Sequence, residues 1–370
     1  MKTLTNLFVK ALAATAVATL IITFSCKKKS DSTPTPATTS SFTQTNLVAD
    51  TAGFNATRID PGLQDAWGLV VNPAAGLIWV TSNGPGTSVV YDSLGNQKLA
   101  PVAIPAGVAS GGTAALGTPS GVIYNTTTGF ALNGSPAKFI FVTEDGTVSA
   151  WNNTANTSAT LVVDSSANGA VYKGVTIARS GSSDYLYVAN FEQRRVDVYD
   201  TTFKYTTGFS FNDPTIPSDY APFNINYIGG QLYVVYAMLK AGSNDDQAGP
   251  GNGYISVFNT NGSFVKRLVS NGNLNSPWAI VQAPSTFGQF ANDLLVSNFG
   301  DGTISAYDLN GNFKGQLEDN TGKVIAIEGI WGLMFPTNGQ PAVNPNRLYF
   351  TAGPDDENHG LFGYLTITTK

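Results

Sequence analysis

A short strand pattern that recurs six times along the 370-residue chain constrains the fold more than any other feature. In each copy, apolar and aromatic residues lead to a small or polar residue at the end, as in a buried β-strand. The copies are residues 77–82, 139–144, 185–190, 231–236, 293–298 and 347–352. They begin roughly 45 to 60 residues apart, a period that is typical of propeller blades.

Further strands flank each copy. A turn and another strand follow it, as in residues 301–313, where Asp301-Gly302 and Asn310-Gly311 mark tight turns. A shorter apolar strand precedes each copy, and no segment has the period of a helix. The repeats predict an all-β fold, a six-bladed β-propeller with four-stranded antiparallel blades.

The last repeat ends too early to supply its own outer strand, because only five residues follow Leu365. Residues 46–50 resemble residues 160–164, an outer strand of the second repeat. An open ring would expose a sheet edge and apolar surface. We therefore expect residues 44–50 to complete the last blade and close the ring.

The first 41 residues have the composition of a targeting signal followed by a tether. Residues 1–25 form a predicted signal peptide, with a basic start and an apolar run over residues 11–24. Residues 23–26 resemble a lipobox, although Phe24 departs from its usual small residue, and Cys26 is the single cysteine. The resemblance implies a lipidated Cys26, an anchor in the outer membrane, and a domain that faces either the periplasm or the exterior. The alternative is an ordinary secretory signal followed by an idle cysteine.

Residues 26–41 form the predicted tether, rich in Ser, Thr and Pro, and residues 42–370 the predicted propeller domain. The chain carries a net charge of −5, and residues 1–41 hold five lysines and one aspartate, so residues 42–370 carry −5 − 4 = −9. No basic stripe occurs, and this excludes a nucleic-acid partner. The lipid bilayer is the expected partner of Cys26, and we expect a monomer.

The repeats resemble NHL-type six-bladed propellers. The sequence of residues 65–92 also resembles a family of secreted bacterial propeller proteins of uncharacterised function. This likeness extends from about residue 46 to the C-terminus. Such motifs specify the fold well and the chemistry poorly, because propellers host many functions.

Aligned second strands predict a ring of residues at one mouth of the channel. Its members are Ser82, Glu144, Asn190, Tyr236 and Asn298, with Ala352 in the sixth blade. Glu144, Asn190 and Asn298 offer the carboxylate and amide oxygens that Ca²⁺ or another divalent cation prefers. The set is similar in ligand type to that of the gluconolactonase and senescence-marker family. The alternative is that these side chains cap strand ends and turns.

Two loops add candidate ligands. The long insertion at residues 237–252 contains Asp245 and Asp246, and the turn at residues 353–360 contains Asp355, Asp356 and the single histidine, His359. Asp301 lies in an equivalent acidic turn. His359 lacks the surrounding pattern of a triad or a zinc site, so we expect a turn residue or one metal ligand.

Three inner strands begin with tryptophan, at Trp67, Trp278 and Trp331. These side chains either stack on a ligand at the mouth or pack between blades, and crowding of the inner strands favours packing.

Two functions remain open from the sequence. The first is a binding or scaffold module that presents one face to a glycan, peptide or protein. The alternative is a divalent-cation-dependent, lactonase-like hydrolase with its site at the channel mouth. The sequence favours a module without catalytic residues, because no nucleophile and base occur together in a known pattern.

Overall fold

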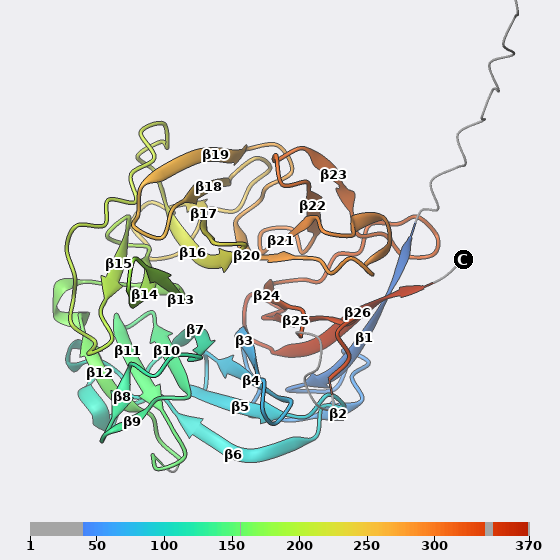
Figure 1. Ribbon diagram of the computed structural model, residues 1–370. Helices are drawn as coiled ribbons and strands as arrows, with labels where there is room; N and C mark the ends of the chain where they lie inside the picture. The colour runs from blue at the N-terminus through green and yellow to red at the C-terminus, as the bar shows by residue number, and fades with distance from the viewer. Residues whose placement is uncertain (1–39, 156, 337–342, 369–370) are drawn as a thin grey trace, which may run out of the picture. The chain divides into compact units, whose positions relative to one another are not determined.

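The computed structural model describes residues 40–155, 157–336 and 343–368, and Cys26 lies outside them. These residues form six radial sheets around a channel, the predicted six-bladed β-propeller (Figure 1). The inner strands are β3 (Ala66–Asn72), β7 (Pro119–Tyr124), β13 (Tyr172–Ser180), β16 (Tyr220–Ile228), β20 (Pro277–Gln282) and β24 (Ile330–Met334). Each inner strand contacts the next, and β24 contacts β3, so the ring is closed.

The repeated pattern from the sequence forms the second strand of every blade. These strands are β4 (Leu77–Ser82), β10 (Phe139–Thr143), β14 (Ser183–Asn190), β17 (Gln231–Met238), β21 (Leu294–Asn298) and β25 (Leu348–Ala352). Most of their residues are buried, since both faces of a blade pack against neighbouring blades.

The third strands follow by antiparallel pairing. They are β5 (Thr87–Tyr91), β11 (Thr147–Trp151), β15 (Arg195–Tyr199), β18 (Tyr254–Phe258), β22 (Ile304–Tyr307) and β26 (Leu361–Thr368). Outer strands complete five of the six blades: β6 (Gln97–Ala103), β12 (Thr160–Asp164), β19 (Phe264–Ser270), β23 (Phe313–Gln316) and β1 (Ser41–Ala49). The third blade has only three strands among the described residues.

The N-terminal strand closes the ring, as predicted. β1 pairs antiparallel with β26 from the opposite end of the chain, over Ser41 to Ala49. Phe42 is buried there against Phe287 and Phe290, with ring centroids 5.1 and 6.0 Å away. β2 (Arg58–Ile59) adds a short fifth strand beside β1. Because β1 pairs with β26, the last blade does not leave β26 as the free sheet edge of an open ring.

Little else is regular. A short hairpin of β8 (Ala131–Leu132) and β9 (Ser135–Pro136) projects from the second blade. Helical turns within the described ranges are four three-residue 3₁₀ helices: η1 (Val108–Ser110), η2 (Gly112–Ala114), η3 (Ser166–Asn168) and η4 (Gly288–Phe290). None of the described helices is long and apolar enough to cross a membrane.

Candidate functional site

A bulge near the start of every inner strand takes one residue out of regular pairing beside the channel. The pairing of each inner strand with its second strand shifts register at this point. The residues at the shift, here called the channel layer, are Trp67, Ser120, Lys173, Phe223, Trp278 and Trp331. A bulge re-aims a side chain and ends regular pairing, and it is often found beside functional sites.

Tryptophan rings from the fifth, sixth and first blades meet in the channel layer. Trp67 and Trp331 stack with centroids 3.7 Å apart, and Trp278 meets both edge-on at 6.2 and 5.8 Å. Each indole is at most 4% exposed. The three tryptophans are therefore buried, and they pack on one another within the channel layer.

Hydroxyl groups from second strands tie the layer of one blade to the next. Thr81 Oγ1 donates to the Ser120 carbonyl at 3.0 Å, and Ser297 Oγ donates to the Trp331 carbonyl at 2.7 Å. Thr351 Oγ1 donates to the Trp67 carbonyl across the seam between the last and first blades. These bonds satisfy carbonyls that the bulges remove from regular pairing.

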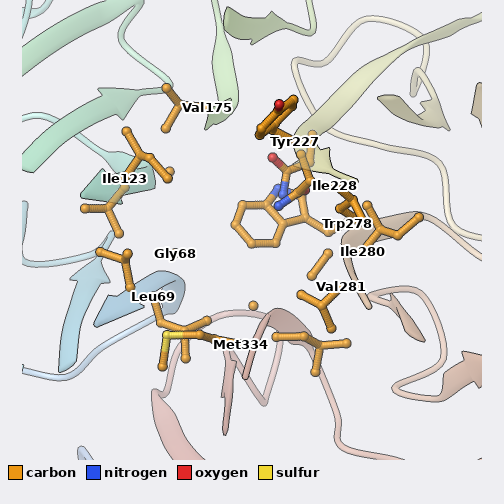
Figure 2. Close-up of a pocket in the computed structure, with 18 of the residues that line it drawn as sticks. Gly68, Leu69, Ile123, Val175, Tyr227, Ile228, Trp278, Ile280, Val281 and Met334 are labelled. Carbon is orange, nitrogen blue, oxygen red and sulfur yellow. The ribbon is translucent and has the colours of Figure 1, made fainter. Parts of the chain in front are cut away.

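The channel layer separates two ends of different character. Beyond it, where the inner strands end, lies a cavity with a volume of about 300 Å³ that is lined largely by apolar side chains (Figure 2). We call this cavity the apolar pocket. At the other end, where the inner strands begin, carboxylates gather.

Five carboxylates form the acidic end, here called the acidic mouth: Asp65, Glu144, Asp245, Asp246 and Glu357. Asp65 precedes β3, and Glu144 follows β10. The aspartate pair lies between β17 and β18, and Glu357 lies between β25 and β26. Strands that alternate in direction place all of these connections at one end of the blades.

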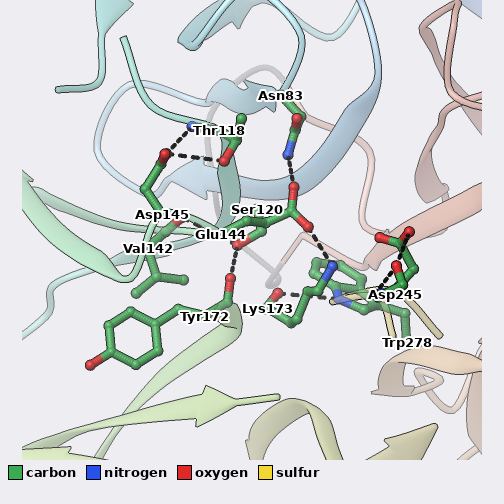
Figure 3. Close-up of polar contacts among 11 residues, drawn as sticks. Asn83, Thr118, Ser120, Val142, Glu144, Asp145, Tyr172, Lys173, Asp245 and Trp278 are labelled. Atoms are coloured by element: carbon green, nitrogen blue, oxygen red, sulfur yellow. Dashed lines mark hydrogen bonds and ion pairs between the residues drawn. The ribbon is translucent and has the colours of Figure 1, made fainter. Parts of the chain in front are cut away.

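One ammonium, that of Lys173, lies among these carboxylates, and Figure 3 shows it beside Glu144. Lys173 Nζ pairs with Glu144 Oε1 and lies 4.9 Å from the centre of the Trp67 ring. Asn83 Nδ2 donates to the other oxygen of Glu144 at 2.8 Å. Burial by itself lowers the pKa of Lys173, but Glu144, Asp245 and Asp246 outweigh burial and leave that pKa raised. Lys173 is therefore a buried cation held by ion pairing.

Asp65 is the most confined of the acids. Asp65 is only 6% exposed, and its Oδ1 has no hydrogen-bond partner among the described residues. Burial raises the pKa of Asp65 well above its usual range, and the nearby charge of Glu357 raises it further. The indole N–H groups of Trp67 and Trp331 lie close enough to the carboxylate to oppose this rise in pKa, although neither has the distance and angle of a hydrogen bond to it. A buried carboxylate oxygen without a partner is costly, so this oxygen favours binding of a cation or donor.

Glu357 reaches the mouth through an unusual turn. Asp355, Asp356 and Glu357 have φ values of 58°, 51° and 66°, the left-handed region that costs roughly 1–2 kcal/mol per residue. Burial raises the pKa of Glu357 from 4.5 to about 7, with Glu144 adding to the rise and Lys173 opposing it. Glu357 is thus half ionised near neutral pH.

The aspartates of the long loop differ from each other. Asp246 Oδ2 is buried without a hydrogen-bond partner among the described residues, and burial raises the pKa of Asp246. Asp245 is exposed and accepts a hydrogen bond from Ser243 Oγ at 2.7 Å. Both aspartates contribute to the field at Lys173, as the raised pKa of that lysine shows.

Of the predicted ring, Glu144 lies in the acidic mouth, whereas the other members are buried within blades. Ser82 Oγ donates to the Gly62 carbonyl at 2.7 Å. Asn190 Nδ2 donates to Asp197 Oδ2 at 2.8 Å, and Asn298 Nδ2 donates to the Asn273 carbonyl at 3.1 Å. Tyr236 and Ala352 are 3% and 0% exposed. The two amides therefore brace turns, and their contacts are separate from those of Glu144.

No group of three or more His, Cys, Asp or Glu residues among those described has the geometry to hold a metal ion. The predicted divalent-cation set of Glu144, Asn190 and Asn298 stays a prediction.

The remaining loop candidates have local partners. Asp301 Oδ1 accepts from the Thr303 amide at 3.0 Å, which makes Asp301 a turn residue. Asp355 and Asp356 are exposed. His359 Nδ1 lies 2.9 Å from Asp50 Oδ2, just after the closing strand, so His359 contacts the ring closure.

The residues missed from the sequence are Asp65, Lys173 and Glu357. A signal for Lys173 was available, since alignment of the inner strands places Lys173 in the column of Trp67, Trp278 and Trp331 as its one charged residue. Asp65 and Glu357 have no comparable signal, because their burial depends on neighbouring blades.

The fold and the channel define a six-bladed β-propeller with a closed ring. No family model matches the chain. It is 36% identical over 334 residues to Uncharacterized protein R648 of Acanthamoeba polyphaga mimivirus, covering 86% of this chain and 79% of that protein. It is 32% identical over 336 residues to Uncharacterized protein L690 of the same virus, covering 86% and 84%. The chain therefore belongs to the family of these viral proteins.

Solved structures agree in fold. A protein of unknown function from Bacteroides thetaiotaomicron gives a TM-score of 0.53 at 8% identity, covering 88% of this chain and 76% of that one. Virginiamycin B lyase from Staphylococcus aureus gives a TM-score of 0.50 at 11% identity, covering 89% and 100%. Such low identities show the fold alone. Of the expected likeness to secreted bacterial propellers, the propeller fold is confirmed, and both relatives described above are viral proteins.

Proposed function

We propose that the protein is a binding module whose acidic mouth captures a cationic group, an ammonium or guanidinium, on a peptide or protein partner. The observation that carries this proposal is the excess of carboxyl groups over cations at the mouth. Five carboxylates surround one ammonium, and Asp65 Oδ1 is buried without a partner among the described residues. A cationic donor from a ligand would supply the missing hydrogen bond and offset the repulsion between the acids.

The module is presented, in this proposal, from the bacterial cell envelope by a lipid on Cys26 and the tether of residues 26–41. Support comes from the lipobox-like residues 23–26 and from the placement of the single cysteine.

A divalent-cation-dependent, lactonase-like hydrolase is the second candidate. Its support is Glu144, which was predicted as a ligand and lies among other carboxylates at the mouth, the ligand type that Ca²⁺ prefers. Asn190 and Asn298 give it less support, because their amides already have partners inside the blades.

Titration of a fluorescent penta-arginine peptide into the full-length protein, followed by anisotropy, tests the first candidate. We expect saturable binding that weakens at least about fivefold in both Asp65→Asn and Glu357→Gln, since each variant lacks a carboxyl group that would ionise against the bound cation. Asp308→Asn, in the β22–β23 turn at the other end of a blade, removes the same charge and should bind like the wild type.

Equal weakening in Asp308→Asn would reduce the effect to net charge and overturn the proposal. A parallel titration with CaCl₂, with δ-gluconolactone as a trial substrate, addresses the alternative. Stoichiometric Ca²⁺ that is lost in Glu144→Ala, together with lactone hydrolysis and no peptide binding, would replace the binding module with the hydrolase.

A further inference from the structure

We infer that the apolar pocket is a second ligand site, which takes a small apolar molecule carrying one hydrogen-bond donor. The pocket occupies the channel at the end opposite the acidic mouth, with a volume of about 300 Å³. Every inner strand contributes a side chain to its wall, and Figure 2 shows them around the cavity. These wall residues are Leu69, Ile123, Val175, Ile228, Val281 and Met334.

The pocket is distinct from the mouth because the channel layer lies between them. Trp278 lines the pocket, while its Nε1 donates to the Lys173 carbonyl at 3.2 Å. Gly68 and Gly332 line the same end. A Cβ on Gly68 would lie 2.8 Å from the Ser120 carbonyl oxygen, so only glycine lets the inner strands approach this closely. The site therefore stands independently of the proposed function.

The lining decides the chemistry of the occupant. None of the described residues that line the pocket is charged, and most are apolar. A volume at the lower end of the usual range for ligand pockets, about 300–1,000 Å³, calls for a small molecule. Apolar surface that leaves water on binding supplies the driving force.

One polar atom sets a further requirement. Asn226 lines the pocket, and its Oδ1 is buried without a hydrogen-bond partner among the described residues. A buried acceptor that stays unpaired costs free energy, and an N–H or O–H on the ligand would recover it. Tyr227, which also lines the pocket, is 45% exposed, so the pocket is reachable from solvent beside that ring.

Fluorescence titration of the full-length protein with 1-naphthol tests the inference, with naphthalene as the matched molecule that lacks a donor. We expect saturable binding of 1-naphthol, and binding of naphthalene that is roughly fivefold weaker for want of the hydrogen bond. Asn226→Leu should bring the two affinities together. Asp65→Asn should leave both unchanged, because the acidic mouth is not involved.

Filling the pocket provides the second arm. Val281→Trp should abolish binding of both molecules, whereas Val265→Trp, at a position 41% exposed on β19, should bind like the wild type. If Val281→Trp fails to fold by circular dichroism, Ile123→Trp takes its place. Absence of saturable binding up to millimolar concentrations, or binding that survives the filled pocket in a folded variant, would overturn the inference.

Discussion

Lys173 and Glu144 form an ion pair that joins the third blade to the second at the base of the acidic mouth. The Lys173 side chain is 2% exposed, and that of Glu144 is 24% exposed. The buried partner is thus the cation. Its charge is stabilised by nearby carboxylates and by the face of the Trp67 indole. The mouth therefore already holds one cation, which the protein supplies itself.

Removing that cation should be costly. We expect Lys173→Met to lower the free energy of unfolding by about 3 kcal/mol, because Glu144 would keep its charge with only the neutral Asn83 amide as a partner. Urea denaturation measures the change. The double variant Lys173→Met/Glu144→Gln should recover much of the loss, and Lys98→Met, which breaks an exposed pair with Asp92, should cost less than about 1 kcal/mol. A fully stable Lys173→Met would show that the pair has no structural role.

Glu357 should make stability fall as pH rises. Its pKa lies at about 7 in the folded protein against 4.5 for the free group, so the folded state binds the proton more tightly and loses stability between these pH values. Glu357→Gln should be more stable than the wild type at pH 8 by on the order of 1–2 kcal/mol, and equal to it near pH 4.5. Denaturation curves at both pH values check this, and a gap of the same size at both would contradict the assignment.

Ligand binding should have the opposite pH dependence. A cation prefers ionised carboxylates, so the affinity for penta-arginine should rise as Glu357 loses its proton around pH 7. Anisotropy titrations at pH 6 and pH 8 measure the difference, which should shrink in Glu357→Gln. Tighter binding at pH 6 would place the peptide elsewhere.

His359 should stabilise the ring closure in acid. Asp50 raises the pKa of His359 above its usual 6.5, and Asp355, 3.8 Å from Nε2, adds to the rise. The stabilisation is complete below the unfolded pKa and is lost as pH rises through the raised folded value. The melting temperature of the wild type should therefore exceed that of His359→Gln most at pH 5.5 and least at pH 9. A difference that grows with pH would contradict the pairing.

The closing strand should be indispensable. Deleting residues 42–52 removes nearly all of β1. We expect a clear fall in melting temperature, because β26 would become a free sheet edge and the apolar side chains that β1 covers would be exposed. Phe42→Ala alone should cost about 3–5 kcal/mol, since Phe42 is 1% exposed. Thr43→Ala, on the exposed side of the same strand, serves as the control. An unchanged melting temperature after the deletion would refute closure by β1.

The strands were predictable because their signal is local. The expected strand at residues 77–82 is β4, and the expected closing strand at residues 44–50 is part of β1. Alternation of apolar residues and turn-forming dipeptides is set by neighbours in the chain, whatever the rest of the fold does. Glu144 was predicted at the mouth for the same reason, because it follows a second strand.

The sequence by itself determined six repeats, their strands and the pairing of the two chain ends, since each repeat must bury its apolar faces against another. Only the tertiary structure decided which side chains face the channel. The bulge that turns Lys173 inward, the left-handed turn that carries Glu357, and the burial of Asp65 all depend on contacts between blades. Asn190 and Asn298 occupy positions equivalent to Glu144, yet their side-chain amides stay within the blades because they donate hydrogen bonds to nearby groups there.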